Sequence, residues 1–231
     1  MRLSLRPLMV LAGALSMCAG AFAGPCQNQN LQLYVALAGT GCQIDDKLFL
    51  NFAYTPVMGA SPLIDQISVI PINTPGDPGL TFTSDNFSAG IGATTEFKIS
   101  YTVMVLPGGH LMVDNELQLN DPLRGRPNGS ITITESKCLG GSLANCPPGS
   151  SISLSVFSTA SDVKLFDRAV FGQVARIDVS KDIVLVGGST TGTSFLSVNQ
   201  TFSETPEPAP FWITGGVLLL AMLRGRRGTI N

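Results

Sequence analysis

Residues 96–105 read Glu96-Phe97-Lys98-Ile99-Ser100-Tyr101-Thr102-Val103-Met104-Val105, the clearest alternating pattern in the chain. Apolar side chains stand at every second position from Phe97 to Val105, and most of the positions between them are polar. Successive side chains of a β-strand point to opposite faces of the sheet. The alternation therefore predicts a strand with one buried face.

Similar period-two runs follow along the chain, at residues 48–55, 64–72, 111–119, 130–135, 151–156, 176–186 and 194–202. Clusters of glycine and proline separate these runs, as at residues 75–79 and 147–149. Short strands at this spacing predict an all-β fold, an antiparallel β-sandwich of about eight to ten strands. Residues 30–38 match helical spacing only in part, and no repeat of fixed period is visible.

The composition excludes several classes of protein. Of the 231 residues, 44% are hydrophobic and 13% charged, which is too apolar for an intrinsically disordered chain. The formal net charge of −2 offers no basic excess, so no nucleic-acid partner is expected. With a single histidine and no phosphate loop, dinucleotide fingerprint or zinc-ligand spacing, we also expect no cofactor and no metal.

The first 23 residues have the pattern of a secretory signal peptide. A short apolar run follows two arginines, and Ala21-Phe22-Ala23 then places small residues before Gly24. An uncleaved anchor helix is the alternative, but the apolar run is short. We therefore expect export through the general secretion machinery and cleavage between Ala23 and Gly24.

The C-terminus carries three features in order. Pro206-Glu207-Pro208 comes first, an apolar stretch from Phe211 to Leu223 follows, and the basic residues Arg224, Arg226 and Arg227 come last. Residues 206–231 thus resemble the PEP-CTERM sorting signal of Gram-negative bacteria. The resemblance implies that an exosortase, a membrane-embedded processing enzyme, recognises the Pro-Glu-Pro. It also implies delivery to the cell surface or to an extracellular polysaccharide matrix.

The apolar stretch of the tail is a marginal membrane anchor. As a helix, residues 211–223 would extend about 20 Å, against a hydrocarbon core of about 30 Å. The arginines at its end favour a cytoplasmic terminus. These properties predict an apolar C-terminal helix that is inserted transiently in the inner membrane until the chain is cut.

Between these segments, residues 24–205 form the expected β-sandwich domain, which holds four cysteines. An exported chain meets an oxidising compartment, so an even number of cysteines predicts two disulfides. Of three possible connectivities we favour Cys26–Cys42 with Cys138–Cys146, because each closes a local loop rich in glycine and asparagine. Metal binding is the competing interpretation, but the spacings are not those of a zinc site.

Few residues suggest catalysis. His110 lies in a predicted turn, and no Gly-x-Ser-x-Gly motif supplies a nucleophile for it. Asp114, Glu116 and Asp121 are close in sequence, as a glycosidase would need, but carboxylates are common on exposed strands. Lys181-Asp182 is most simply an exposed ion pair or a turn. We expect no enzyme activity.

These features predict an exported structural or adhesive protein of the cell surface or extracellular matrix, sorted by an exosortase. The alternative is a carbohydrate-binding module that holds exopolysaccharide. Such a module would need exposed aromatic side chains on one sheet face, and Tyr34, Tyr54 and Tyr101 are the three tyrosines available.

Overall fold

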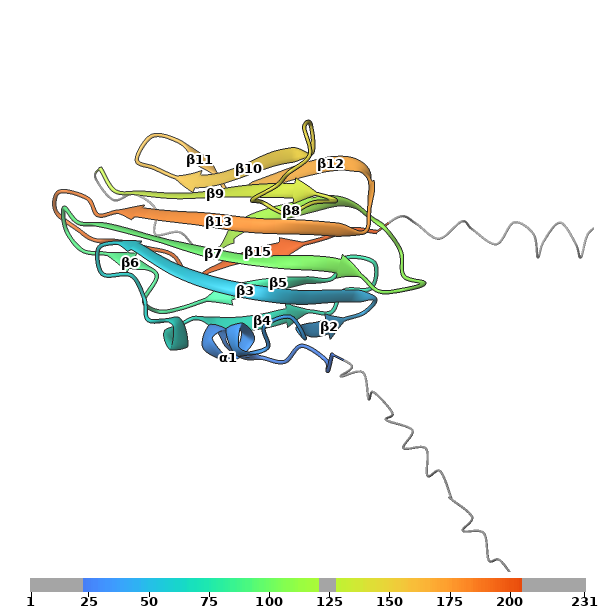
Figure 1. Ribbon diagram of the computed structural model, residues 1–231. Helices are drawn as coiled ribbons and strands as arrows, with labels where there is room; N and C mark the ends of the chain where they lie inside the picture. Colours follow the sequence, from blue (N-terminus) through green and yellow to red (C-terminus); the bar gives the residue numbers. More distant parts are fainter. Residues whose placement is uncertain (1–22, 121–127, 205–231) are drawn as a thin grey trace, which may run out of the picture.

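The computed structural model describes residues 23–120 and 128–204 and shows an all-β, antiparallel sandwich (Figure 1). The six-stranded sheet has the order β1 (Gln29–Asn30), β4 (Ser68–Ile72), β5 (Gly79–Thr83), β15 (Ser197–Thr201), β8 (Met112–Asn120) and β12 (Phe166–Val174). The seven-stranded sheet has the order β11 (Val163–Lys164), β10 (Ser151–Ser158), β9 (Ser130–Leu139), β13 (Arg176–Val186), β7 (Thr94–Val105), β3 (Lys47–Met58) and β2 (Cys42–Ile44). A short ribbon pairs β6 (Ser88–Ala89) with β14 (Thr193–Ser194).

The expected fold class is confirmed at the level of an all-β antiparallel sandwich. The described residues form ten strands of five or more residues and five shorter ones. On β7, the side chains of Phe97, Ile99, Tyr101 and Val103 are all buried against the opposite sheet, as the alternation predicts. Strand β13 likewise buries every second residue along its length. The core therefore lies between the two sheets.

Both open edges of the sandwich are covered. Helix α1 (Leu31–Ala36) contacts β3 and β4, which belong to different sheets, and buries Leu31 and Tyr34 there. The side chain of Asn30 caps this helix by accepting a hydrogen bond from the Leu33 N–H at 3.1 Å. At the other edge β10 contacts β12, and the Ser155 N–H donates to the Asp167 carboxylate at 2.8 Å.

The structure changes several predicted elements. The run at 64–72 is split into a 3-10 turn, η1 (Ile64–Gln66), and strand β4, while the run at 194–202 is split between β14 and β15. The partial helical pattern at 30–38 forms the single short helix α1. Strands β5 and β12 were not predicted. Strand β5 begins at Gly79, where an added Cβ would lie 2.0 Å from the Gln200 carbonyl oxygen, so this glycine allows close pairing with β15.

The hydrogen-bonded fold begins at Gly24 and ends at Glu204 within the described residues. The Gly24 carbonyl accepts from the Gln43 N–H at 2.8 Å, and the Glu204 N–H donates to the Gly76 carbonyl at 3.0 Å. Both ends of this fold lie at the same end of the sandwich (Figure 1). The predicted C-terminal apolar helix, the signal peptide up to residue 22 and Asp121 lie outside the described residues.

Candidate functional site

A groove runs across the outer face of the six-stranded sheet. It has a volume of about 200 Å³ and is lined by Ile72, Asp77, Glu116, Gln118, Phe166, Asn199 and Thr201. These residues come from β4, the β4–β5 turn, β15, β8 and β12; the last three strands are neighbours in the sheet, and β5 separates them from β4. Alternate residues of one strand share a face, so Glu116 and Gln118 of β8 both point outward, as do Asn199 and Thr201 of β15.

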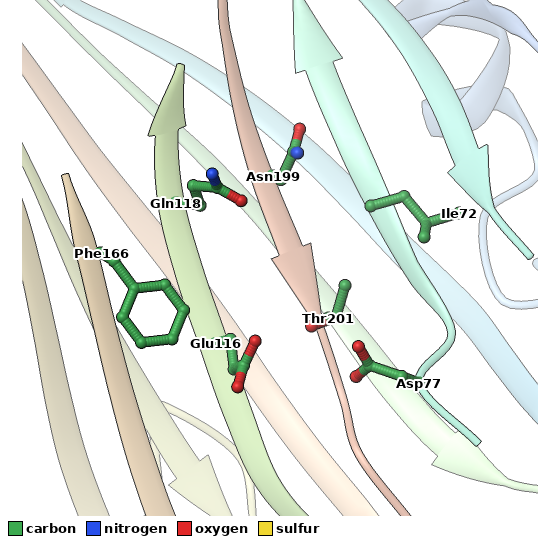
Figure 2. Close-up of a pocket in the computed structure, with 7 residues that line it drawn as sticks. All are labelled: Ile72, Asp77, Glu116, Gln118, Phe166, Asn199 and Thr201. Carbon is green, nitrogen blue, oxygen red and sulfur yellow. The ribbon is translucent and has the colours of Figure 1, made fainter. Parts of the chain in front are cut away.

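Strand register arranges the groove in two cross-strand rows. The first row is Phe166, Gln118 and Asn199, since Gln118 is the partner of both other residues. The second row contains Glu116 and Thr201, with Asp77 beside them (Figure 2). An aromatic ring and two amides therefore lie along one row, and carboxylates mark the neighbouring one.

Phe166 is the aromatic side chain of the groove, and it is 49% exposed. Gln118 is exposed beside it, and Asn199 is partly buried because its Oδ1 accepts from the Thr81 hydroxyl at 2.9 Å. The amides offer both donors and acceptors, while the ring offers an apolar face. This combination suits a ligand with hydroxyl groups and apolar C–H faces.

One arginine, Arg168, interacts with one carboxylate of the groove and with a buried carboxylate beside it. Arg168 of β12 contacts the Asp114 carboxylate, and its Nε lies 3.4 Å from Glu116 Oε1. Asp114 is 2% exposed and also accepts from the Ser203 N–H at 3.3 Å, so it supports the fold and does not face the groove. Burial raises the pKa of Glu116, with Arg168 opposing that shift and Asp77 adding to it.

The two neighbouring acids of β8, Asp114 and Glu116, therefore have different roles. Asp114 and Glu116 share the outer face of β8, as the alternation predicts, but Asp114 is buried and not on an exposed strand surface. Both acids interact with the Arg168 guanidinium. The arrangement supplies binding groups and leaves Glu116 as the accessible acid.

A second cluster surrounds the end of the described chain. Asp46, His110 and Glu204 place possible metal-ligand atoms within 4.8 Å of one another. However, the fully buried Lys47 donates to Asp46 and, at 2.5 Å, to Glu204 Oε1. The carboxylates are thus already paired with an ammonium group. His110, expected as a solvated turn residue, is 43% exposed and lies 3.6 Å from Glu204 Oε2.

The two acids of this cluster have opposite pKa shifts. Burial raises the pKa of Asp46, but hydrogen bonds from Lys47, from Glu204 and from the His110 N–H outweigh it, and the pKa falls. Burial raises the pKa of Glu204, and Asp46 adds to that shift while Lys47 opposes it. Gly109 permits this packing, because an added Cβ would lie 2.5 Å from Asp46 Oδ2. The cluster fastens the last described residue to the β2–β3 turn.

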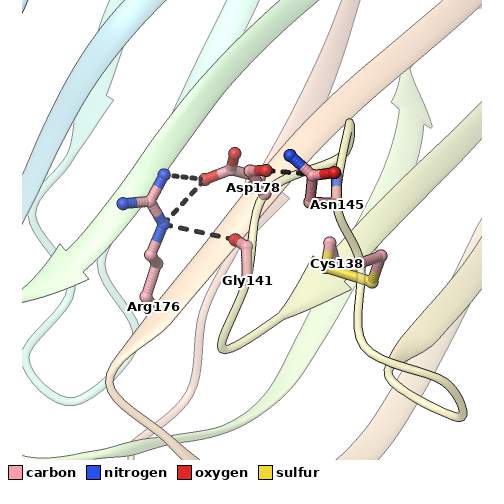
Figure 3. The surroundings of a disulfide bond; sticks show 7 residues. Cys138, Gly141, Asn145, Arg176 and Asp178 are labelled. Carbon is pink, nitrogen blue, oxygen red and sulfur yellow. Dashed lines mark hydrogen bonds and ion pairs between the residues drawn. A yellow bond between two sulfur atoms is a disulfide. The ribbon is translucent and has the colours of Figure 1, made fainter.

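The two disulfides join the pairs favoured from sequence. Cys26 and Cys42 have Cα atoms 4.8 Å apart, and Cys138 and Cys146 have Cα atoms 5.5 Å apart. Beside the second disulfide, Arg176 donates to the Gly141 carbonyl at 3.2 Å and holds the loop (Figure 3). Two disulfides indicate folding in an oxidising, extracytoplasmic environment.

The three tyrosines do not form an exposed aromatic platform. Tyr34 and Tyr101 are buried in the core, and the Tyr54 hydroxyl donates to the Pro62 carbonyl at 2.5 Å. Phe166 is instead the exposed aromatic side chain of the groove, and sequence reasoning missed it. Phe166 and Val170 of β12 point outward and Ala169 points inward, but polar residues on both faces of β12 leave no clear alternation in the sequence that could have revealed Phe166.

The other predicted site residues divide between the ends of the chain. Ala23 and Gly24 begin the described region, beside Pro25, which pairs with Gln43. The remaining ones lie outside the described residues: Ala21, Pro206, Glu207, Pro208, Arg224, Arg226 and Arg227. Among the described residues, no helix has the length and apolar character to cross a membrane.

Comparison with known proteins gives no family assignment. No protein-family model matches the chain, and neither does any curated protein sequence. The structure of TmCBM61 in complex with β-1,4-galactotriose is 14% identical over 66% of this chain and 88% of that one, with a TM-score of 0.35. The enzymatically active domain of bacteriophage CBA120 tailspike protein 4 is 8% identical over 67% of this chain and 19% of that one, with a TM-score of 0.30. At these TM-scores neither similarity bears on function.

Proposed function

We propose that this chain is an exported structural or adhesive protein of the cell surface or extracellular matrix, sorted by an exosortase through Pro206-Glu207-Pro208. The observation that carries the proposal is the position of the folded body. Within the described residues, its first hydrogen bond involves Gly24, immediately after the predicted cleavage site, and its last involves Glu204, two residues before the Pro-Glu-Pro. Both predicted processing sites therefore flank the described sandwich, and cutting at them would leave its described hydrogen bonds intact.

The intact mass of the protein recovered from its native cell surface or medium tests this proposal. We expect loss of residues 1–23 and a cut near residues 206–208, with any added mass identifying an attached group. Alanine substitution of Pro206, Glu207 and Pro208 together should leave the tail uncut, whereas Pro210→Ala should be processed normally. A native protein that retains its tail through Asn231 would contradict sorting by an exosortase.

A second candidate function, polysaccharide binding, is favoured by the groove on the six-stranded sheet. Phe166 offers a half-exposed ring in line with the amides of Gln118 and Asn199. Aromatic faces pack against the apolar C–H faces of sugars, and amides can pair with their hydroxyls. The groove, of about 200 Å³, is smaller than the roughly 300–1,000 Å³ of pockets that enclose small ligands. It is suited to a short part of a long polymer.

Binding to the host's purified exopolysaccharide tests this candidate. Phe166→Ala should weaken binding roughly tenfold, which corresponds to about 1.4 kcal/mol. Val170→Ala is the matched control, because Val170 lies on the same strand, is 73% exposed and does not line the groove. Equal binding by both variants would remove the groove as the binding site, and no binding by the unaltered protein would remove the candidate.

A further inference from the structure

Four polar side chains meet in the centre of the core. Lys181 of β13, Glu135 of β9 and Gln200 of β15 have no exposed surface, and Tyr101 of β7 is 2% exposed. Lys181 Nζ contacts both Glu135 Oε2 and Gln200 Oε1. This position contradicts the expectation that Lys181 forms an exposed ion pair. Asp182, its neighbour, does form one, with Lys98 at 3.3 Å.

The contacts between these four side chains would allow the Lys181 amine to react with the Gln200 amide. The Lys181 amine touches the carbonyl oxygen of the Gln200 amide and is therefore close to its carbonyl carbon. Glu135 bridges the amine and the amide nitrogen, because Gln200 Nε2 donates to its second oxygen at 2.7 Å. The Tyr101 hydroxyl donates to Gln200 Oε1 at 2.5 Å, where negative charge would develop.

The surroundings favour a nucleophilic amine. Burial lowers the pKa of Lys181, although Glu135 opposes this shift, so the neutral amine is easier to form than in water. Burial also raises the pKa of Tyr101 well above its usual value, which keeps its hydroxyl a hydrogen-bond donor. A buried amine, a carboxylate that can move protons and an oxyanion donor are the elements of acyl transfer.

The balance of buried charges also favours a reaction that neutralises one lysine. Lys137, also fully buried, lies 3.5 Å from Glu135 Oε1, so two buried lysines share one buried glutamate. An unbalanced charge in an apolar interior is costly. Conversion of one lysine into a neutral amide would leave a balanced pair of one lysine and Glu135.

We propose that Lys181 and Gln200 are joined by an intramolecular isopeptide bond, which forms within the folded core with Glu135 as the proton carrier. Lys181 Nζ bonds to Gln200 Cδ, and the bond from Cδ to Nε2 breaks. Two protons pass from Nζ through Glu135 to Nε2, so that nitrogen leaves as ammonium and the new amide keeps one N–H. The step needs neither an oxidant nor a reductant.

Lys137 is the weaker nucleophile candidate in this network. Its Nζ contacts Asn115 Oδ1, across the sandwich on β8. However, the Asn115 amide nitrogen donates to the Thr201 carbonyl at 3.0 Å instead of to Glu135. That nitrogen therefore has no proton carrier among its described contacts, whereas the Gln200 nitrogen has one.

The mass of the full chain, exported and recovered with its disulfides intact, tests the proposal. We expect a mass lower by about 17 Da, the mass of ammonia, than that of the processed sequence with two disulfides. Trypsin should fail to cut after Lys181. After chymotryptic cleavage at Phe195, the peptide that contains Lys181 should stay linked to the peptide that contains Gln200. An unshifted mass with normal cleavage after Lys181 would overturn the proposal.

Peptide mapping separates the proposed bond from other losses of ammonia. A loss that maps to the Asn128-Gly129 step, or to Lys137 with Asn115, would also overturn it. Lys181→Arg should abolish the loss, whereas the matched control Lys137→Arg should retain it. Because the unaltered protein alone decides the question, a variant that fails to fold does not affect the outcome.

Discussion

Lys47→Met should destabilise the sandwich strongly, although it replaces one long, unbranched side chain with another. The Lys47 side chain is completely buried, and its ammonium pairs with Asp46 and Glu204, whose side chains are 20% and 8% exposed. Without the ammonium, two neighbouring carboxylates would remain in a partly dry site. Removal of one partner from a buried ion pair costs about 3–5 kcal/mol.

The expected change in melting temperature follows from the size of the domain. For chains of 150–250 residues, 1 kcal/mol shifts the melting temperature by about 2–4 °C. The low end of the cost, about 3 kcal/mol, therefore predicts a fall of about 9 °C. Adding Glu204→Gln to Lys47→Met should recover part of the loss, because the second substitution removes one of the unpaired charges.

Thermal unfolding of the exported, disulfide-intact protein at pH 7 is the assay, followed by circular dichroism. The matched control is Lys98→Met, which breaks a lysine–aspartate pair with side chains 45% and 36% exposed. Exposed pairs contribute about 0–1 kcal/mol, so the control should fall by no more than about 4 °C. Equal melting temperatures for the two variants would refute the conclusion that burial makes the Lys47 cluster important.

The remaining predictions concern the disulfides and the alkaline limit of stability. Replacing Cys26 and Cys42 with alanine should cost about 3 kcal/mol, and replacing Cys138 and Cys146 slightly less, since their sequence separations are 16 and 8. A larger loss for the shorter loop, measured by denaturant unfolding, would contradict the chain-entropy argument. Burial raises the pKa of Tyr34 to about 12, against a backbone hydrogen bond to Gln27 that lowers it. The protonated Tyr34 hydroxyl therefore contributes fully to the free energy of unfolding below pH 10. This contribution, about 3 kcal/mol, is lost as the pH rises toward 12. Tyr34→Phe should lose less stability than the unaltered protein between these pH values, and parallel pH curves would contradict this reasoning.

The strands that sequence reasoning found are those with one buried face and sufficient length. Strand β13 has the predicted bounds, and β7 starts two residues earlier than the quoted stretch, because alternation directly records which face is buried. Strand β5 has five residues and follows a turn cluster, so its alternation is too short to recognise. Strand β12 lies at the edge of the sheet, where both faces carry polar residues and the contrast between them is weak.

The candidate sites were harder to predict because their members meet only through strand register. Phe166 and Gln118 are partners across β12 and β8, and neither position carries a motif. The sequence alone favours a surface position for Lys181, because an isolated charge is costly to bury. Its partners, Glu135 and Gln200, stand 46 and 19 residues away on two other strands, so the pairing exists only in the folded chain.

The buried lysines share one property that bears on a structural role. Lys47, Lys137 and Lys181 all lie on the seven-stranded sheet, and each contacts a residue of the opposite sheet or of the segment that follows it. Two of these contacts hold the last part of the fold, Gln200 in β15 and Glu204 beyond it. If the protein is attached through the segment after residue 204, any pulling force reaches these two residues first. Strand β15 is central in its sheet, between β5 and β8, so its extraction must break both hydrogen-bond ladders together. A covalent bond from Gln200 to Lys181 would transmit this force directly to β13 in the other sheet, instead of through the hydrogen bonds of β15. Lys47 and Lys181 would thus link the end of the fold to the seven-stranded sheet where a surface attachment would apply force.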